Sequence, residues 1–126
     1  MSRSIPRILI AGVHSGSGKT TLSLALVAAL RRRGLRVQTF KVGPDFLDPT
    51  YLALASGRAC YNLDSWMSSR EYVGRLFRQA TENADVAIIE GVMGLFDGAD
   101  PGTSAGSTAE IARLLKAPIL LPANVH

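Results

Sequence analysis

Residues 7–21 read Arg-Ile-Leu-Ile-Ala-Gly-Val-His-Ser-Gly-Ser-Gly-Lys-Thr-Thr. The apolar run from Arg7 to Ala11 ends at a glycine, which predicts a short buried strand of a parallel sheet. The segment from Lys19 to Arg33 is rich in Leu and Ala and is followed by Gly34, which predicts a helix. Glycines between a strand and a helix let backbone amides turn inward and bind an anion at the helix N-terminus. The stretch therefore predicts a phosphate-binding loop.

This loop differs by one residue from the usual phosphate-loop pattern, G-x-x-x-x-G-K-[ST], because the first glycine of that pattern would fall at Val13. Gly12 stands one place earlier. We expect Lys19 to reach the β- and γ-phosphates of ATP and the Thr20 hydroxyl to bind Mg²⁺. The residues expected to bind the nucleotide are Gly12, Ser15, Gly16, Ser17, Gly18, Lys19, Thr20 and Thr21.

Predicted strands and helices alternate along the rest of the chain. Strands are predicted at residues 36–42, 85–90 and 118–121, and helices at about 50–56, 68–83 and 107–116. The last two helices begin with capping boxes, Ser68 to Glu71 and Ser107 to Glu110. A long glycine-rich loop is predicted over residues 91–106. This order predicts an α/β fold with an open parallel sheet and helices on both faces, as in phosphate-loop NTPases.

The composition excludes several classes of protein. The chain has 126 residues, of which 47% are hydrophobic, so it suits one globular domain and is neither collagen-like nor disordered. Its single Cys excludes a disulfide framework and a zinc site built from several thiolates. No apolar run is long enough to span a membrane or to form a signal peptide. We therefore expect a cytoplasmic protein without a membrane partner.

The net charge of +4 owes much to Arg31, Arg32, Arg33 and Arg36. Cations at the C-terminal end of a helix complement the helix dipole, and the run stands where the first predicted helix ends. No aromatic residue interleaves with these arginines as stacking on single-stranded nucleic acid would require. We expect no nucleic-acid partner.

Two more segments bring charged residues to the edge of the sheet where open α/β folds bind ligands. Glu90 closes an apolar strand, and an acid at this place can hold the Mg²⁺ of a nucleotide. Lys41, Asp45 and Asp48 flank or lie in the loop at residues 43–49, which follows a strand at the same edge. Carboxylates there could bind a metal, position an attacking group or orient a substrate. A polar strand end and simple turn formation are the alternatives.

Four motifs in the chain are long and specific. They are residues 42–49 (Val-Gly-Pro-Asp-Phe-Leu-Asp-Pro), 62–64 (Asn-Leu-Asp), 90–98 (Glu-Gly-Val-Met-Gly-Leu-Phe-Asp-Gly) and 106–109 (Gly-Ser-Thr-Ala). Together they resemble the cobyrinic acid a,c-diamide synthase family and its hydrogenobyrinic acid counterpart. The resemblance covers about residues 7–121 and implies a fold similar to that of dethiobiotin synthetase.

The resemblance implies an ATP- and glutamine-dependent ligase of cobalamin biosynthesis. ATP would phosphorylate the c and then the a carboxylate of a corrin ring, and ammonia would attack each acyl phosphate. Lys19 and Lys41, together with Mg²⁺, would neutralise the charge of the transferring phosphoryl group. By the same resemblance, the metal ligands are Thr20, Glu90 and Asp45.

The remaining roles that the resemblance implies concern the substrate. Asp48 and Asp97 would position the substrate or ammonia, and Leu47 would line the side of the site that binds the ring. The expected catalytic residues are therefore Lys19, Lys41, Asp48 and Asp97, and the expected substrate-binding residues are Leu47, Asp48 and Asp97.

Members of this family continue with further strands, an adenine-binding segment and a glutaminase domain. We therefore expect a C-terminally incomplete phosphate-loop domain whose ammonia comes from a glutaminase domain or subunit outside this chain. His14 stands where related partitioning ATPases carry a signature lysine, which argues against that class. A diamide synthase for another tetrapyrrole, a dethiobiotin synthetase-like carboxylase and a non-catalytic nucleotide-binding fragment stay open as alternatives, as does a homodimer.

Overall fold

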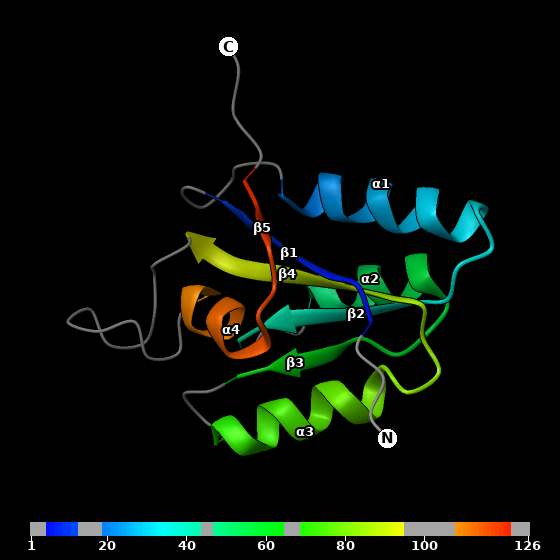
Figure 1. The fold of residues 1–126 in the computed structure, drawn as a ribbon. Coiled ribbons are helices and arrows are strands. Elements are labelled where there is room, and N and C mark those ends of the chain that lie inside the picture. Colours follow the sequence, from blue (N-terminus) through cyan, green and yellow to red (C-terminus); the bar gives the residue numbers. More distant parts are fainter. Residues whose placement is uncertain (1–4, 13–18, 44–46, 65–68, 95–107, 122–126) are drawn as a thin grey trace, which may run out of the picture.

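The computed structural model describes residues 5–12, 19–43, 47–64, 69–94 and 108–121, which form a sheet with helices on both faces (Figure 1). All strand pairs are parallel, and the order across the sheet is β3-β2-β4-β1-β5. The strands are β1 (Arg7–Gly12), β2 (Val37–Val42), β3 (Tyr61–Leu63), β4 (Val86–Gly94) and β5 (Ile119–Leu120). The helices are α1 (Lys19–Arg32), α2 (Asp48–Ser56), α3 (Arg70–Ala80) and α4 (Thr108–Leu115).

Two hydrophobic clusters, one on each face, join the sheet to its helices. On one face, Ile10 and Ile88 pack with Val27 of α1, and Ala55 of α2 packs against them. The cluster on the other face joins Phe40 and Ile89 of the sheet to residues of α3 and α4: Val73, Phe77, Ile111, Ala112 and Leu115. Alternate residues of a strand point to opposite faces, so strands buried on both sides read as continuous apolar runs. This arrangement confirms the expected open parallel sheet with helices on both faces.

The short strand β3 was not expected from the sequence. Its residues pair with Phe40, Lys41 and Val42 of β2, at the edge of the sheet. Tyr61 is exposed and Asn62 is polar, so this three-residue strand carries little of the apolar signal that identifies the others. The structure therefore adds a strand between α2 and α3, next to the predicted site residue Lys41.

Strand β4 is longer than predicted. It runs on to Gly94, so the prediction of a loop beginning at Gly91 was wrong. Gly91 allows the strand to pass close to α4, because a Cβ at Gly91 would lie 2.7 Å from Thr108 Cγ2 and 3.2 Å from the Ile10 carbonyl oxygen. The glycine therefore reflects close packing as well as backbone freedom.

Helix ends differ from the predictions by a few residues. The N-cap of α3 is Ser69, whose side chain accepts a hydrogen bond from the Tyr72 amide, so the cap lies one residue beyond the predicted Ser68. The helix ends at Ala80 instead of Asn83 because the backbone turns at Thr81. Helix α2 begins at Asp48, two residues before the predicted start, since its first turn accommodates a proline.

The carboxyl ends of the parallel strands lie at one edge of the sheet. Four strands end there: β1 at Gly12, β2 at Val42, β3 at Leu63 and β4 at Gly94.

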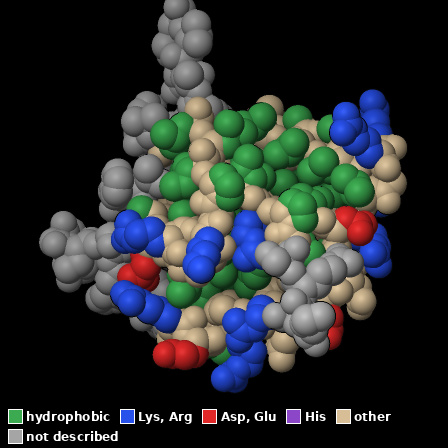
Figure 2. Space-filling view, viewed as in Figure 1, with side chains coloured by type: hydrophobic (Ala, Val, Ile, Leu, Met, Phe, Trp, Pro, Cys, Tyr) green, Lys and Arg blue, Asp and Glu red, His purple; other side chains and the backbone are tan. Residues whose placement is uncertain are grey.

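Figure 2 shows hydrophobic side chains around the upper part of the molecule, near β5, where Ile119 and Leu121 are exposed. Within the described ranges, no helix is long and apolar enough to cross a membrane.

Candidate functional site

Three polar side chains form a row across neighbouring strands near their carboxyl ends. Lys41 of β2 pairs in register with Asn62 of β3 on one side and with Glu90 of β4 on the other. Paired residues of parallel strands point to the same face of a sheet. Lys41 contacts Asp48 of α2, and Glu90 contacts Thr20 of α1, so the row faces these two helices.

Lys41 is the centre of this row and is 1% exposed. Its Nζ donates to Glu90 Oε1 at 2.8 Å, to Asp48 Oδ2 at 3.0 Å and to the Gly91 carbonyl oxygen at 3.0 Å. Burial opposes the charge and lowers the pKa of the Lys41 ammonium. The hydrogen bonds and negative charges of Glu90 and Asp48 outweigh that effect, so the pKa lies above the usual lysine value. Lys41 is therefore a cation held in place by two carboxylates.

Glu90 joins this cation to the first turn of α1. The Thr20 hydroxyl donates to Glu90 Oε1 at 3.2 Å, and the glutamate side chain is fully buried. The second oxygen, Oε2, is buried and has no hydrogen-bond partner among the described residues. A buried carboxylate oxygen without a donor suits a cation ligand, and Mg²⁺ prefers carboxylate and hydroxyl oxygens. Thr20 and Glu90 therefore fit a magnesium ion.

A metal ion here would need ligands besides these side chains. In the part of the chain that the structure describes, no three His, Cys, Asp or Glu residues gather as a metal-binding group. Mg²⁺ is commonly held by one or two protein groups together with phosphate oxygens and water. The pair Thr20 and Glu90 suits that mode, in which the nucleotide itself supplies part of the coordination.

Asp48 and Leu47 lie at the start of α2. Leu47 is the N-cap residue and is 65% exposed, and its own side chain makes no capping hydrogen bond. Asp48 stands in the first turn, where a negative charge is favoured by the helix dipole. The structure thus brings Asp48 to Lys41, while Leu47 projects toward solvent beside it.

Asn62 is a site residue to which the sequence assigned no role. Its Nδ2 donates to the Gly43 carbonyl oxygen at 2.7 Å, and the Gly43 amide donates to the Leu63 carbonyl oxygen at 2.9 Å. Gly43 has a φ of +85°, a conformation that glycine adopts without strain. Asn62 belongs to a motif recognised in the sequence, but its contact depends on β3, which was not predicted.

The predicted nucleotide-binding residues are only partly described. Gly12 ends β1, and Lys19, Thr20 and Thr21 form the first turn of α1, so strand and helix have the predicted order. The predicted residues that lie outside the described ranges are Ser15, Gly16, Ser17, Gly18, Asp45 and Asp97. Of the predicted catalytic and metal-binding residues, Thr20, Lys41, Asp48 and Glu90 are joined by hydrogen bonds.

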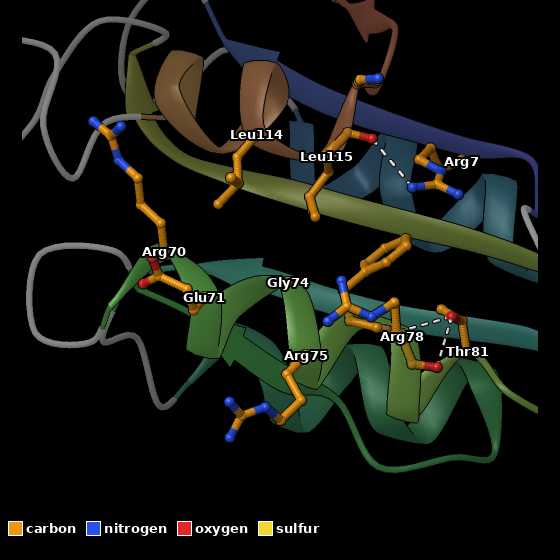
Figure 3. Close-up of a pocket in the computed structure, with 11 residues that line it drawn as sticks. Arg7, Arg70, Glu71, Gly74, Arg75, Arg78, Thr81, Leu114 and Leu115 are labelled. Carbon is orange, nitrogen blue, oxygen red and sulfur yellow. Dashed lines mark hydrogen bonds between the residues drawn. The ribbon is translucent and has the colours of Figure 1, made fainter. Parts of the chain in front are cut away.

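A separate cavity of about 650 Å³ lies between α3 and α4, on the face of the sheet away from Lys41 (Figure 3). Its lining includes Phe77 and several cations, and it contains none of the predicted site residues. The Cζ atom of Arg7 lies 4.7 Å from the centroid of the Phe77 ring. The same guanidinium donates a hydrogen bond to the Leu115 carbonyl oxygen and so holds β1 to α4. The row around Lys41 is therefore the candidate site.

Comparison with known families agrees with this topology. Residues 8–118 match the protein family described as "CbiA: CobQ/CobB/MinD/ParA nucleotide binding domain". The chain belongs to this family. This membership confirms the resemblance that was inferred from the motifs of the sequence. It also confirms the expected phosphate-loop class of fold.

Curated relatives of this nucleotide binding domain are much longer than the chain. It is 68% identical over 123 residues to the cobyrinate a,c-diamide synthase of Syntrophotalea carbinolica, covering 98% of the chain and 27% of the relative. The cobyrinate a,c-diamide synthase of Leptospira interrogans (strain Fiocruz L1-130) is 56% identical, with 96% and 27% covered. The hydrogenobyrinate a,c-diamide synthase of Streptomyces coelicolor is 51% identical, with 94% and 24% covered. The chain thus spans about a quarter of these relatives.

Solved structures show the same fold at low sequence identity. The signal recognition particle receptor FtsY from Elizabethkingia anophelis, in complex with GDP, has a TM-score of 0.64 and 22% identity. The likeness covers 96% of this nucleotide binding domain and 41% of the receptor chain. A structural likeness at this level of sequence identity supports a shared fold and gives no information about shared chemistry.

Proposed function

We propose that this chain is the nucleotide-binding part of an enzyme that amidates the a and c carboxylates of cobyrinic or hydrogenobyrinic acid. The proposal rests on the buried Lys41, which two carboxylates hold beside Thr20 at the carboxyl ends of the strands. It is supported by relatives named cobyrinate and hydrogenobyrinate a,c-diamide synthase, which are 68% and 51% identical to the chain.

ATP would bind where β1 leads into α1. The backbone amides of residues 13–18 and the N-terminus of α1 would bind its phosphates, with Lys19 placing a further positive charge on them. Thr20 and Glu90, with Asp45, would hold Mg²⁺. When bound, this ion would supply positive charge to the phosphate oxygens.

The carboxylate of the substrate would be activated by phosphorylation. One of its oxygens attacks the γ-phosphorus of ATP, the bond to ADP breaks, and an acyl phosphate forms. Charge neutralisation is the main requirement of such a transfer. Lys41 would provide it, because its raised pKa keeps the ammonium charged at neutral pH.

Ammonia would then complete the amide. Its nitrogen attacks the acyl carbon, a proton is released, and the bond to phosphate breaks, so the phosphate carries away one oxygen of the original carboxylate. Asp48 is hydrogen-bonded to Lys41 and would orient the substrate or accept hydrogen bonds from ammonia. Asp97 would share this task, and Leu47 would contact the apolar ring. A glutaminase domain or subunit outside this chain would supply the ammonia.

The proposal can be tested with three candidate substrates. The chain is incubated with ATP, Mg²⁺ and ammonium chloride, together with cobyrinic acid, hydrogenobyrinic acid or nickel-sirohydrochlorin, and products are separated by mass. We expect amides of cobyrinic or hydrogenobyrinic acid, formed only when Mg²⁺ and ATP are present. Amidation of nickel-sirohydrochlorin alone would show that the substrate is a different tetrapyrrole and not a corrinoid. The absence of an amide from all three compounds would refute the proposal.

A further inference from the structure

The turn that follows β2 is held by two consecutive residues of β3. The Asn62 side-chain amide donates to the Gly43 carbonyl oxygen, and the Leu63 carbonyl oxygen accepts from the Gly43 amide. Both polar groups of Gly43 are thereby bound to the edge strand, at a residue whose φ of +85° sets the direction of the chain that leaves the sheet. Asn62 is the side chain that fixes this exit.

The other end of the same segment is held by Lys41. The chain leaves the sheet at Gly43 and enters α2 at Asp48, whose carboxylate accepts from Lys41 Nζ at 3.0 Å. Lys41 and Asn62 are paired in register on neighbouring strands. Two adjacent side chains of the sheet therefore anchor the start and the end of the segment from Gly43 to Asp48.

We infer that Asn62 is a positioning residue for the carboxylate-binding side of the site. It acts through Gly43, by fixing where the segment that carries Asp48 begins. This inference rests on the proposed function for the identity of the carboxylate substrate. Its structural part, that Asn62 holds Gly43 at the end of β2, stands without it.

The topology separates this role from nucleotide binding. Among the described strands, β3 pairs with β2 alone, whereas Gly12 ends β1 on the far side of β4 and Thr20 of α1 contacts Glu90 of β4. Loss of the Asn62 hydrogen bond should therefore loosen the segment at residues 43–48 and leave the first turn of α1 in place. The result should be weaker use of the carboxylate substrate at an unchanged affinity for ATP.

Two variants remove the hydrogen bond from Asn62 to Gly43. Asn62→Ala removes the side-chain amide, and Asn62→Asp keeps its shape but replaces the donor with an oxygen that repels the Gly43 carbonyl. Asn83→Ala is the matched control, because Asn83 is exposed and its only described hydrogen bond uses the backbone carbonyl, which the variant keeps. If the donor matters, both Asn62 variants behave alike and the control behaves as wild type.

Hydrogen exchange of the whole chain provides a readout that needs no activity. We expect the peptide spanning residues 43–50 to exchange at least about threefold faster in both Asn62 variants, with the peptide spanning residues 19–32 unchanged. Equal exchange at residues 43–50 in wild type and both variants would overturn the inference. Faster exchange throughout the chain would also overturn it, since Asn62 would then support the fold in general.

Kinetics with ammonium as nitrogen donor give the second readout. We expect kcat/KM for the corrinoid carboxylate to fall roughly tenfold in both Asn62 variants, the size of effect typical of one hydrogen bond. The Kd for ATP, measured with a fluorescent analogue, should stay within about twofold of wild type. An equal loss of ATP affinity would contradict the inference. Absence of amidation in the wild-type chain would refute the proposed function, while the exchange measurement would still decide the role of Asn62.

Discussion

Lys41 and Glu90 lie opposite each other on neighbouring strands, and the Lys41 ammonium donates to Glu90 Oε1 at 2.8 Å. Their side chains are 2% and 0% exposed, so the pair is an internal ion pair of the sheet. Two charges removed from water are tolerated only where each compensates the other and hydrogen bonds satisfy the rest. This pair therefore links the stability of the sheet to the chemistry of the site.

Replacing Lys41 should destabilise the fold. Lys41→Met leaves the buried Glu90 carboxylate without its cation, and breaking a buried pair in this way typically costs roughly 3–5 kcal/mol. Urea unfolding, followed by circular dichroism, measures the loss. The double variant Lys41→Met/Glu90→Gln also removes the buried charge of Glu90 and leaves only the partly exposed Asp48 without Lys41, so it should be more stable than Lys41→Met. A single variant within about 1 kcal/mol of wild type would contradict the buried pairing.

The same pair predicts a dependence of stability on alkaline pH. The pKa of Lys41 is raised in the folded chain from its usual value of 10.5, since Glu90 and Asp48 outweigh burial. Its contribution to stability is therefore complete below pH 10.5 and is lost as the pH rises through the higher folded-state pKa. Unfolding by urea at pH 7 to 11.5 should show a fall at the alkaline end that is smaller in Lys41→Met. An equal fall in both proteins would assign the alkaline loss to other groups.

Gly91 should tolerate no side chain. A Cβ at this position would lie 2.7 Å from Thr108 Cγ2, so Gly91→Ala must displace the start of α4, at a cost of roughly 1–3 kcal/mol. Gly74→Ala is the control, because Gly74 lies within α3 and its Cβ would meet only the end of the Arg78 side chain, at 3.4 Å. That change should be neutral or should stabilise the helix by about 0.5–1 kcal/mol. The free energies of unfolding of the two variants decide the matter, and equal values would refute the close contact.

Glu90 should govern the response of nucleotide affinity to magnesium. In wild type, Mg²⁺ is expected to tighten binding of a fluorescent ATP analogue roughly tenfold, because Glu90 would help to hold the ion, which would supply positive charge to the phosphates. Glu90→Gln should abolish most of this gain and leave binding without Mg²⁺ nearly unchanged. Glu82 is exposed, and Glu82→Gln serves as the matched control. A normal magnesium response in Glu90→Gln would exclude Glu90 from the metal site.

Strands with a strong apolar pattern could be predicted from the sequence, and so could the edge at which the site lies. Residues 9–12 of β1 and 87–91 of β4 are buried, and Glu90 follows an apolar run at the point where β4 was expected to end. Such a charge is informative because burying it requires a partner. Its partner, Lys41, was recognised as a site residue for a different reason, because it stands beside the loop at residues 43–49 that brings two carboxylates to the same edge.

The pairing of these residues could not be predicted in the same way. The register that places Asn62, Lys41 and Glu90 in one row depends on β3, whose three residues include an exposed Tyr61 and a polar Asn62. The early start of α2 at Asp48 was missed because the proline immediately before the predicted start reads as a helix breaker, although the first turn of a helix accommodates it. Contacts between distant segments follow from packing, which local patterns do not encode.

The most direct measurement follows one oxygen atom from substrate to product. Cobyrinic acid labelled with ¹⁸O in its carboxylates is incubated with the chain, ATP, Mg²⁺ and ammonium chloride, and the released phosphate is analysed by mass spectrometry. Activation of a carboxylate by phosphorylation predicts one ¹⁸O atom in phosphate for each amide formed, with both products lost in Lys41→Met. Amide formation with unlabelled phosphate, or no amide from wild type, would contradict acyl-phosphate chemistry at the site formed by Thr20, Lys41, Asp48 and Glu90.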